Sequence, residues 1–587
     1  MKKETILKKI ILPIFLIACG VAYSFICPPY SQQDLAWFGL APLLIVLRFC
    51  SPRKGFLAGL CFGAGFWFPA IYWFVTLGNK GCPFFLVIIA YILLALVCAA
   101  FTAIFSMLVA RLWQGVTYIS YDEYMDEQER LNALDDREYK IESDRYDRKM
   151  KQLRQSLIFA ETWRVPVIAL IWVGLEYLRE LAGFSWNTLA VSQYESYSVV
   201  QLSALGGTAA ISFVIVVVNA GIAGTAVRMW RLLYLQEYPR IKRHFDLWLA
   251  LIIALCAMVF GIKEYKSTEK TIGQLDSPNE LMLVGAINNH DTPYLQRELT
   301  SVAIFNNLLN QTYELSTNKL DLIIWPETSV PFLLPSQEFD AYISEFVTKG
   351  NFSLIVGGVE NATPEKKEFD LGYNVSYLYS PNQKEKAIYK KRHLVPFGEY
   401  LPLDETLPFI RNFAPFGYSV RTGDGAQLFE IKGVKIGALI CFEDTFSSTV
   451  RESVNAGARL LISQSNDMWF DSDTEKIQHH ANSVFRAIET RTPLIRVSNE
   501  GYMGVVLPTG KVFQLYAPDE NVLREYVVPR SKNTPPTFYM IVGDWILAIP
   551  AAIFVVIFIC CFSYKYYAEK KLKQIDAHQE EKSDSKA

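Results

Sequence analysis

Cysteine is scarce in the part of this 587-residue chain that is compatible with water. Between Lys263 and Tyr539 the sequence has a single cysteine, Cys441, and the other nine lie within or beside apolar stretches. One thiol cannot form a disulfide within that segment, so a disulfide framework is excluded there. A lone cysteine is a candidate nucleophile, although taken by itself it fits ordinary packing in a core better.

The chain also lacks a strong charge of either sign and has few histidines. The net charge is −2, so bulk charge gives no reason to expect nucleic acid as a partner. The six histidines are scattered except for His479 and His480, which point in different directions if they lie on a helix. We therefore predict no metal and no cofactor.

Long apolar runs, in contrast, are abundant. The chain is 51% hydrophobic, which is too apolar for an ordinary soluble protein and fits a membrane unit plus one sizeable soluble domain. We count about eight spans, each near the ~20 residues that a transmembrane helix needs. We interpret the first run as an uncleaved anchor, because further apolar runs follow it. The runs are 10–27, 33–50, 55–78, 83–112, 158–180, 198–227, 246–263 and 540–563.

Basic residues cluster at the start of the chain and in alternate loops, which predicts the orientation. By the positive-inside rule both ends face the cytoplasm, and seven crossings then place 264–538 outside. In a bacterial cell this is the periplasmic side of the inner membrane. The predicted domains are a membrane domain at 1–263, an extracytoplasmic catalytic domain at 264–538, a last span at 539–563 and a tail at 564–587. The orienting residues are Lys2, Lys3, Lys8, Lys9, Arg53, Lys54, Arg228, Arg231, Arg240, Lys242, Arg243, Lys565, Lys570 and Lys571.

A charged insert occupies 121–155. It has 8 Lys/Arg and 11 Asp/Glu residues and contains neither glycine nor proline. Helix-forming residues dominate it, so a solvated cytoplasmic helix or helical hairpin is expected. We predict an accessory element without chemistry of its own.

The outer segment alternates between strand-like and helix-like patterns. This alternation predicts a layered α/β domain with its site where apolar strands end. The strand-like runs are 281–287, 322–325, 353–356, 374–379, 436–441 and 460–463, and the helix-like runs are 293–315, 337–348, 445–456 and 476–490.

Three ionisable residues stand at or near such strand ends, in the order Glu327, Lys391, Cys441. A thiol attacks as its thiolate, so it needs a base or a positive neighbourhood. Glu327 could accept the thiol proton, and Lys391 could stabilise the oxyanion of a tetrahedral intermediate. Together these residues describe acyl transfer through a thioester. Taken singly, the same residues also fit a core cysteine, a surface carboxylate and a solvated basic run, so chemistry alone leaves the triad open.

Four local motifs occur in one order: Trp325-Pro-Glu-Thr, Tyr389-Lys-Lys-Arg-His-Leu-Val-Pro-Phe-Gly-Glu, Leu439-Ile-Cys-Phe-Glu and Ser465-Asn-Asp-Met-Trp-Phe. This set resembles the nitrilase, or carbon–nitrogen hydrolase, superfamily. With the flanking spans, and with Phe184-Ser-Trp-Asn in the loop after the fifth span, it is similar to the apolipoprotein N-acyltransferase family in particular. The resemblance covers nearly the whole chain.

The resemblance implies a fold and roles for individual residues. The fold is an αββα sandwich attached to an α-helical membrane bundle. Glu327 would be the general base, Cys441 the nucleophile and Lys391 the stabilising lysine, because Lys391 stands two residues before His393. Glu399 and Glu443 would support the site.

The implied reaction moves an acyl chain between two lipids. Cys441 would take the chain from a phospholipid as a thioester, and the N-terminal amine of a diacylglyceryl-cysteine in an apolipoprotein would then attack it. The partners are therefore these two substrates and the bilayer, and we expect a monomer. Water must be excluded, so we predict a lid at 402–425. Its candidate acyl-chain contacts are Leu407, Phe409, Phe413, Phe416 and Tyr418.

Two departures and two alternatives remain. Phe442 stands where the family commonly has tyrosine, and the segment around Tyr294 lacks a tryptophan that the family tends to carry, although Tyr294 could supply an aromatic face. The first alternative is a membrane-tethered amidase or nitrilase that acts on a small molecule. The second is a non-catalytic membrane scaffold that keeps the fold.

Overall fold

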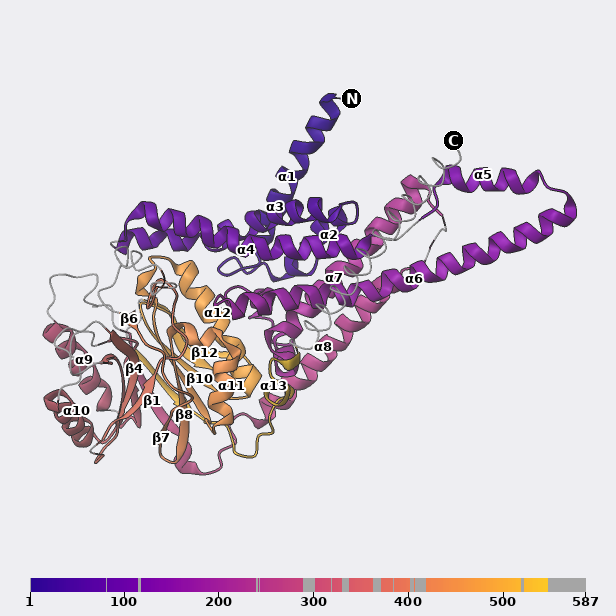
Figure 1. Cartoon of the computed structure of the whole chain (residues 1–587). Helices are drawn as coiled ribbons and strands as arrows, with labels where there is room; N and C mark the ends of the chain where they lie inside the picture. Colours follow the sequence, from indigo (N-terminus) through magenta and orange to yellow (C-terminus); the bar gives the residue numbers. More distant parts are fainter. Residues whose placement is uncertain are drawn as a thin grey trace, which may run out of the picture.

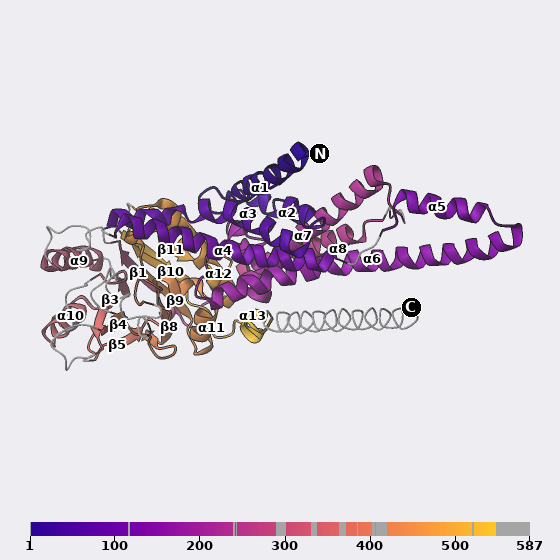
Figure 2. The same cartoon turned by 45° about the horizontal axis from the view of Figure 1, so that its top comes forward.

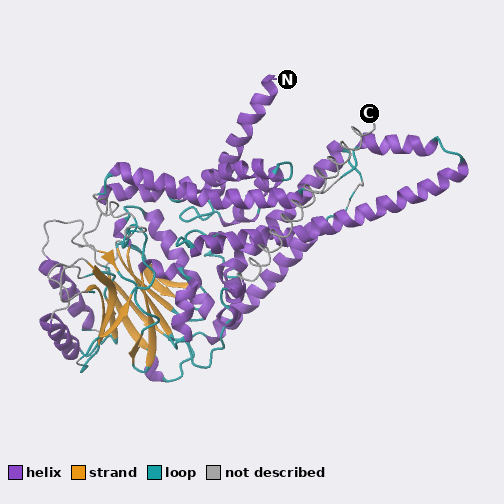
Figure 3. Ribbon diagram, viewed as in Figure 1, coloured by secondary structure: helices purple, strands orange, loops and turns teal. Residues whose placement is uncertain are grey.

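The structure is a computed structural model. It describes residues 2–80, 82–114, 118–238, 241, 243–288, 301–317, 319–329, 337–362, 371–383, 385–401, 406, 419–518 and 522–546. A long helical part, which we call the membrane unit, carries a compact α/β domain at one end (Figure 1). All the main strands lie in the α/β domain (Figure 3).

The apolar runs of the membrane unit fold as helices, since continuous apolar sequence hides its backbone polar groups best in this form. Within the described part of the chain, four helices are long and apolar enough to cross a membrane, or five if the pair Pro52–Ala70 and Tyr72–Lys80, bent by 44°, counts as one span. The bounds are α1 Lys2–Ser24, α2 Ala41–Leu47, α3 Pro52–Ala70, α4 Phe84–Trp113, α5 Tyr121–Asn132, α6 Asp136–Leu181, α7 Ser203–Trp230 and α8 Phe245–Thr271.

The predicted count of eight spans is therefore confirmed only in part. Two of the predicted runs form shorter apolar helices, Ile10–Ser24 and Gln33–Leu47, and most of the predicted last span lies outside the described residues. The multi-pass character of the chain is clear, and the number of crossings stays a prediction. Helix α8 also continues to Thr271, past the predicted domain boundary at 263.

The charged insert is a helical hairpin, as its composition predicts. Helix α5 begins at a capping box in which Ser120 accepts a hydrogen bond from the amide of Glu123 while the Glu123 side chain accepts one from the amide of Ser120. The second arm is the beginning of α6, whose 46 residues run from the insert into the bundle without a break. Figures 1 and 2 both place this hairpin at the end of the molecule opposite the α/β domain.

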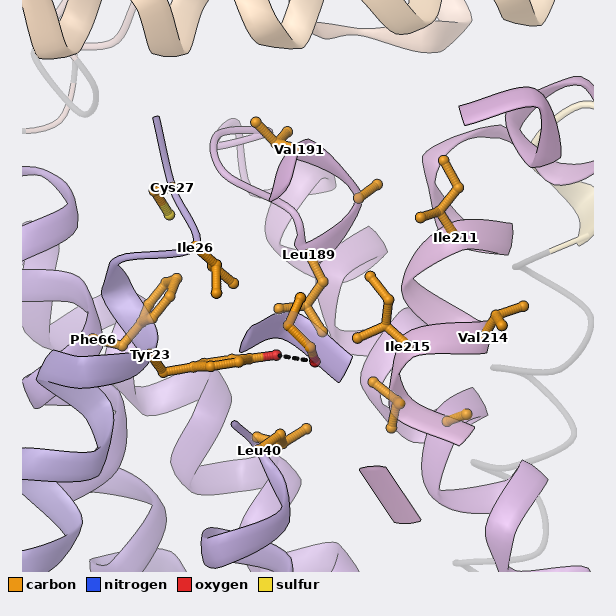
Figure 4. Packing of buried hydrophobic residues seen from close by; sticks show 14 of the residues in the cluster. Tyr23, Ile26, Cys27, Leu40, Phe66, Leu189, Val191, Ile211, Val214 and Ile215 are labelled. Carbon is orange, nitrogen blue, oxygen red and sulfur yellow. Dashed lines mark hydrogen bonds between the residues drawn. The ribbon is translucent and has the colours of Figure 1, made fainter. Parts of the chain in front are cut away.

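Aromatic and aliphatic side chains pack the centre of the membrane unit. Tyr23 of α1 lies among Leu40, Leu189 and Ile215, and its hydroxyl donates a hydrogen bond to the carbonyl of Ala36 at 3.2 Å (Figure 4). Burial of a polar tyrosine tip is tolerated because this bond satisfies it.

The α/β domain contains two sheets. One has the strand order β13-β1-β2-β3-β4-β5, with β6 beside β4, and the other has the order β12-β11-β10-β9-β8-β7. Strands β1, β2 and β3 are parallel to one another, as are β8, β9 and β10. The strands are β1 Met282–Ile287, β2 Leu322–Ile324, β3 Ser353–Asn361, β4 Leu371–Tyr379, β5 Ala387–Lys390, β6 Ser419–Val420, β7 Leu428–Ile431, β8 Val434–Ile440, β9 Leu460–Asn466, β10 Leu494–Asn499, β11 Met503–Val506, β12 Val512–Tyr516 and β13 Val522–Val527.

Side-chain alternation along these strands generates the layers. In β1, Val284 faces a core made only by the two sheets, whereas Leu283 faces the helices on the outer side. In β9, Leu460 faces the sheet-to-sheet core and Leu461 faces outward. Successive side chains of a strand point to opposite faces of its sheet, so a strand with apolar residues at every position is buried on both faces.

Helices cover both outer faces and complete an αββα sandwich, as predicted. The first sheet is covered by α9 Ser301–Ser316 and α10 Gln337–Gly350, and the second by α11 Ser447–Asn455 and α12 Asp473–Thr490. The last described helix is α13 Phe538–Val542. Because α12 also joins the core of the membrane unit, the second sheet is the one that lies beside the bundle.

Candidate active site

The three residues predicted as a triad converge. Glu327 follows β2, Lys391 follows β5, and Cys441 follows β8. The Nζ atom of Lys391 lies 3.5 Å from Oε1 of Glu327, and the Cys441 thiol is close enough to interact electrostatically with both side chains. Strand ends from both sheets thus bring a carboxylate, an ammonium and a thiol together. We call these three residues with Glu399 the thiol cluster.

The nucleophile candidate has unusual backbone geometry. Cys441 has a φ of +51°, a region that non-glycine residues rarely adopt. It begins the short 3-10 helix η8, Cys441–Thr445, directly after β8, a strand that is buried at every residue except Lys435. Strain of this kind persists only where the surroundings enforce it, and here the sharp turn sets the thiol at the strand edge.

Glu399 and Asn374 hold the two charged partners of the thiol. Glu399 Oε1 accepts from Lys391 Nζ at 2.9 Å, and its Oε2 accepts from the amide of Val395 at 2.8 Å. Asn374 donates to both carboxylates, to Glu327 at 2.8 Å and to Glu399 at 2.9 Å. No motif points to Asn374, which is predicted only as part of a strand, whereas Glu399 belongs to the motif that contains Lys391.

Glu443 fixes the turn that carries the thiol. Its buried carboxylate accepts hydrogen bonds from the amides of Ile440, Arg392 and His393, at 2.8, 2.6 and 3.1 Å. The hydroxyl of Tyr389 adds a fourth bond at 2.8 Å. Glu443 therefore ties this turn, Cys441–Thr445, which we call the nucleophile turn, to the segment that holds Lys391. This fits the supporting role expected for Glu443.

Burial dominates the electrostatics of the thiol cluster. Burial raises the pKa of Glu327, and Glu399 adds to this against the opposing effect of Lys391. Burial also raises the pKa of the Cys441 thiol well above its usual value, with a further contribution from Glu327. For Lys391, burial lowers the pKa, but Glu399 and Glu327 outweigh it, so the pKa is raised and the side chain stays an ammonium.

This arrangement suits acyl transfer with coupled proton movement. The resting thiol is protonated, and a carboxylate with a raised pKa is positioned to accept its proton as a bond to carbon forms. The permanent charge of Lys391 can stabilise the negative charge that develops on the attacked carbonyl oxygen.

A loop of the membrane unit touches the nucleophile turn. The ring of Trp186 stacks near that of Phe442, with centroids 6.3 Å apart, and Ser185 shares a 2.5 Å hydrogen bond with Thr445. Both residues belong to the Phe184-Ser-Trp-Asn motif. Phe442, which stands in place of the family tyrosine, therefore faces an aromatic partner from the bundle.

Gln478 of α12 anchors the α/β domain to the bundle. Its Oε1 accepts from the ring nitrogens of Trp73 and Trp186, at 3.0 and 2.9 Å, and from Asn187 at 3.1 Å. Its Nε2 donates to the carbonyls of Pro28 and Ala70. One buried amide thus bonds to three separate segments of the membrane unit, and no sequence pattern predicts this role.

Other predicted residues lie outside the described part of the chain. These are Tyr294 and all five lid candidates, Leu407, Phe409, Phe413, Phe416 and Tyr418. Among described residues, Asp467, Glu475 and His479 are close enough to hold a metal ion together. However, the guanidinium of Arg496 lies 3.0 Å from Asp467, and both nitrogens of His479 already face carboxylates. This donor set suits a network of ion pairs better than a cation.

The two-sheet sandwich and the converging carboxylate, ammonium and thiol define a carbon–nitrogen hydrolase type of domain attached to membrane helices. In agreement, the carbon-nitrogen hydrolase family model matches residues 293–526. The model of the apolipoprotein N-acyltransferase N-terminal domain matches residues 19–121 and 150–221. The chain therefore belongs to the apolipoprotein N-acyltransferase family.

Individual relatives agree with the family models. An apolipoprotein N-acyltransferase of Geobacter metallireducens is 28% identical over 511 residues, which cover 85% of this chain and 86% of that protein. One of Gloeobacter violaceus is 26% identical and covers 91% of both chains. Among solved structures, a carbon-nitrogen hydrolase from Helicobacter pylori has 16% identity and a TM-score of 0.34, and it covers 43% of this chain and 90% of that one.

Proposed function

We propose that this protein is a phospholipid–apolipoprotein N-acyltransferase in which Cys441 carries the acyl chain. The observation that supports this most is the meeting of Glu327, Lys391 and Cys441 in a domain whose nucleophile turn touches the membrane unit. Substrates that are lipids require such a position, because the reacting ester or amine must come from the bilayer.

In the first step the Sγ atom of Cys441 attacks the ester carbonyl carbon of a phospholipid, and the thiol proton passes to Glu327. Lys391 stabilises the oxyanion. The ester C–O bond then breaks, and the leaving oxygen takes the proton from Glu327, which releases a lysophospholipid and leaves a thioester.

In the second step the α-amine of a diacylglyceryl-cysteine attacks the thioester, and Glu327 accepts a proton from the nitrogen. The C–S bond breaks, the amide forms, and the sulfur recovers its proton. Glu327 thus acts twice as a base and twice as an acid, which suits a pKa raised by burial. Glu399 and Glu443 hold Lys391 and the nucleophile turn in place.

The proposed setting is the inner membrane of a bacterium, with eight spans and the domain 264–538 on the periplasmic side. The positive-inside pattern of the loops supports this orientation. The segment 402–425 is proposed as the lid that keeps water from the thioester, and the protein is proposed to act as a monomer.

The test uses purified full-length protein, a phospholipid and a synthetic diacylglyceryl lipopeptide. Wild type should convert the lipopeptide to its N-acyl form with one lysophospholipid per product, and Cys441→Ser should give none. Cys256→Ser is the matched control, because Cys256 lies exposed on α8, and it should retain full activity. Full activity of Cys441→Ser would reject the assignment. Ammonia release from small amides without lipid consumption would select the amidase instead.

A further inference from the structure

Four buried charged side chains form a closed ring behind the nucleophile turn. Asp444 faces His479 Nε2 at 3.1 Å, and His479 Nδ1 faces Asp467 at 2.9 Å. Arg496 closes the ring, because its two terminal nitrogens donate to Asp467 at 3.0 Å and to Asp444 at 2.6 Å. We call Asp444, His479, Asp467 and Arg496 the charge ring. Each of the four is at most 2% exposed.

The charge ring is electrically balanced only if His479 is an imidazolium. Both of its ring nitrogens face a carboxylate oxygen, so both must be donors. Burial and Arg496 lower the pKa of His479, but Asp444 and Asp467 outweigh them and raise it to about 10. Burial raises the pKa of Asp467, but Arg496 and His479 outweigh burial and lower that pKa below its usual range. The pKa of Asp444 is lowered by His479 and Arg496 in the same way. Two anions and two cations then cancel.

Two further titratable groups of α12 lie near the charge ring, and the pKa shift of each favours its neutral form. Glu475 lies 3.8 Å from His479, and burial together with Asp467 raises the pKa of Glu475 to about 8. Burial and Arg496 lower the pKa of the neighbouring His480 to about 3. Neither group therefore changes the balance of two positive and two negative charges at neutral pH.

The charge ring connects the thiol to the membrane unit. Asp444 stands three residues after Cys441 in the nucleophile turn. The hydroxyl of Ser463 on β9 donates a hydrogen bond to Oδ2 of Asp444 at 2.8 Å. His479 follows Gln478, the residue that anchors α12 to the bundle. The ring of Trp186 lies near both His479, at 5.5 Å, and Phe442, at 6.3 Å. A continuous set of contacts thus runs from the bundle through α12 to the nucleophile.

We propose that His479 is a positioning residue for the acyl transfer: its positive charge, held between Asp444 and Asp467, fixes the nucleophile turn and offsets part of the field of Asp467 at the sulfur of Cys441. The proposal rests on the proposed function only in taking Cys441 as the nucleophile. Glu327, Asp467 and Glu399 raise the pKa of this thiol, and Lys391 lowers it. Removal of the imidazolium leaves Asp467 less compensated, so the thiolate of Cys441 becomes harder to form.

The test measures iodoacetamide modification of Cys441 against pH in full-length protein, quantified on the peptide that contains it. His479→Gln should move the profile to higher pH, and a rise of about one unit in the thiol pKa should lower the thiolate fraction, and N-acyl transfer with it, about tenfold. The double variant His479→Gln with Asp467→Asn removes one charge of each sign, so its profile should return towards wild type. His480→Gln is the matched control on the same helix, and its profile should coincide with wild type.

Asp467→Asn alone provides a second measurement if His479→Gln fails to fold, and it should move the profile to lower pH. The proposal is overturned if the profiles of folded His479→Gln and wild type coincide, or if His480→Gln shifts as far as His479→Gln. It is also overturned if Asp467→Asn leaves the profile unmoved. Thiol modification needs no lipid, so these results are independent of whether the N-acylation assay succeeds.

Discussion

The thiol cluster and the charge ring lie close together in the same domain, and both bury several charged groups, yet their electrostatics differ. In the charge ring two acids alternate with two cations, and the pKa values of Asp444 and Asp467 fall. In the thiol cluster two acids share one lysine, and the pKa values of Glu327 and Cys441 rise. Complete pairing makes a rigid support, whereas incomplete pairing leaves groups that can exchange a proton at working pH.

Among the variants that test this comparison, Lys391→Met should lower activity most, since it removes the only cation of the thiol cluster. We expect kcat for N-acyl transfer to fall about 10²–10³-fold, because the developing oxyanion loses its stabilising charge. Steady-state kinetics with the lipopeptide measures this. Lys390→Met is the matched control: that side chain pairs with Glu360 at 3.0 Å, away from the thiol, and its kcat should change less than threefold. Equal losses in both variants would contradict the role of Lys391.

Asn374→Ala should have an intermediate effect: the loss of its hydrogen bond to the reacting carboxylate Glu327 should lower kcat/KM about tenfold. The bond from Asn374 lowers the pKa of Glu327, so its loss raises that pKa further. A base must be unprotonated to act, and the acid limb of the kcat/KM profile should therefore move to higher pH. Asn499→Ala is the control, because Asn499 bonds the main-chain oxygen of Glu327 and should leave the limb in place. An unmoved limb in Asn374→Ala would argue against Glu327 as the base.

Glu475→Gln should change stability with pH rather than activity. The pKa of Glu475 is raised to about 8 in the fold, against about 4.3 in an unfolded chain. Its contribution to stability is complete below the unfolded value and is lost as pH rises through about 8. Glutamine imitates the neutral acid, so the gain of the variant over wild type should grow by up to about 1.4 kcal/mol per pH unit between about 4.3 and 8, and should stay constant above 8. Unfolding midpoints at pH 5, 6, 7 and 9 measure this, and a difference that stays constant between pH 5 and pH 7 would contradict it.

Deletion of the charged hairpin should have the smallest effect. The family model omits 122–149, and the hairpin lies at the end of the molecule opposite the α/β domain (Figures 1 and 2). Replacement of these residues by a short Gly-Ser linker should leave N-acyl transfer within about twofold of wild type. A larger loss would mean that the hairpin supports the bundle, for instance through the stacking of Tyr124 on Tyr238 at 3.8 Å.

The sequence predicts the reactive residues better than their supports. Cys441, Glu327 and Lys391 belong to local motifs, and the apolar strands before Glu327 and Cys441 place those two at the edge of the sheets. Asn374 and His479 bond to residues that lie far away in the sequence. Their roles depend on how β4 and α12 pack, which no local pattern encodes. Short edge strands such as β7 and β12 escaped prediction because four or five residues of mixed burial carry little periodic signal.

The central claim is tested most directly by the mass of the protein itself after incubation with phospholipid and no acceptor. We predict that the peptide containing Cys441 gains the mass of one acyl chain, and that addition of the lipopeptide removes it as the N-acyl product forms. An unmodified Cys441, or an acyl chain on another residue, in a preparation that still makes product would contradict the thioester mechanism.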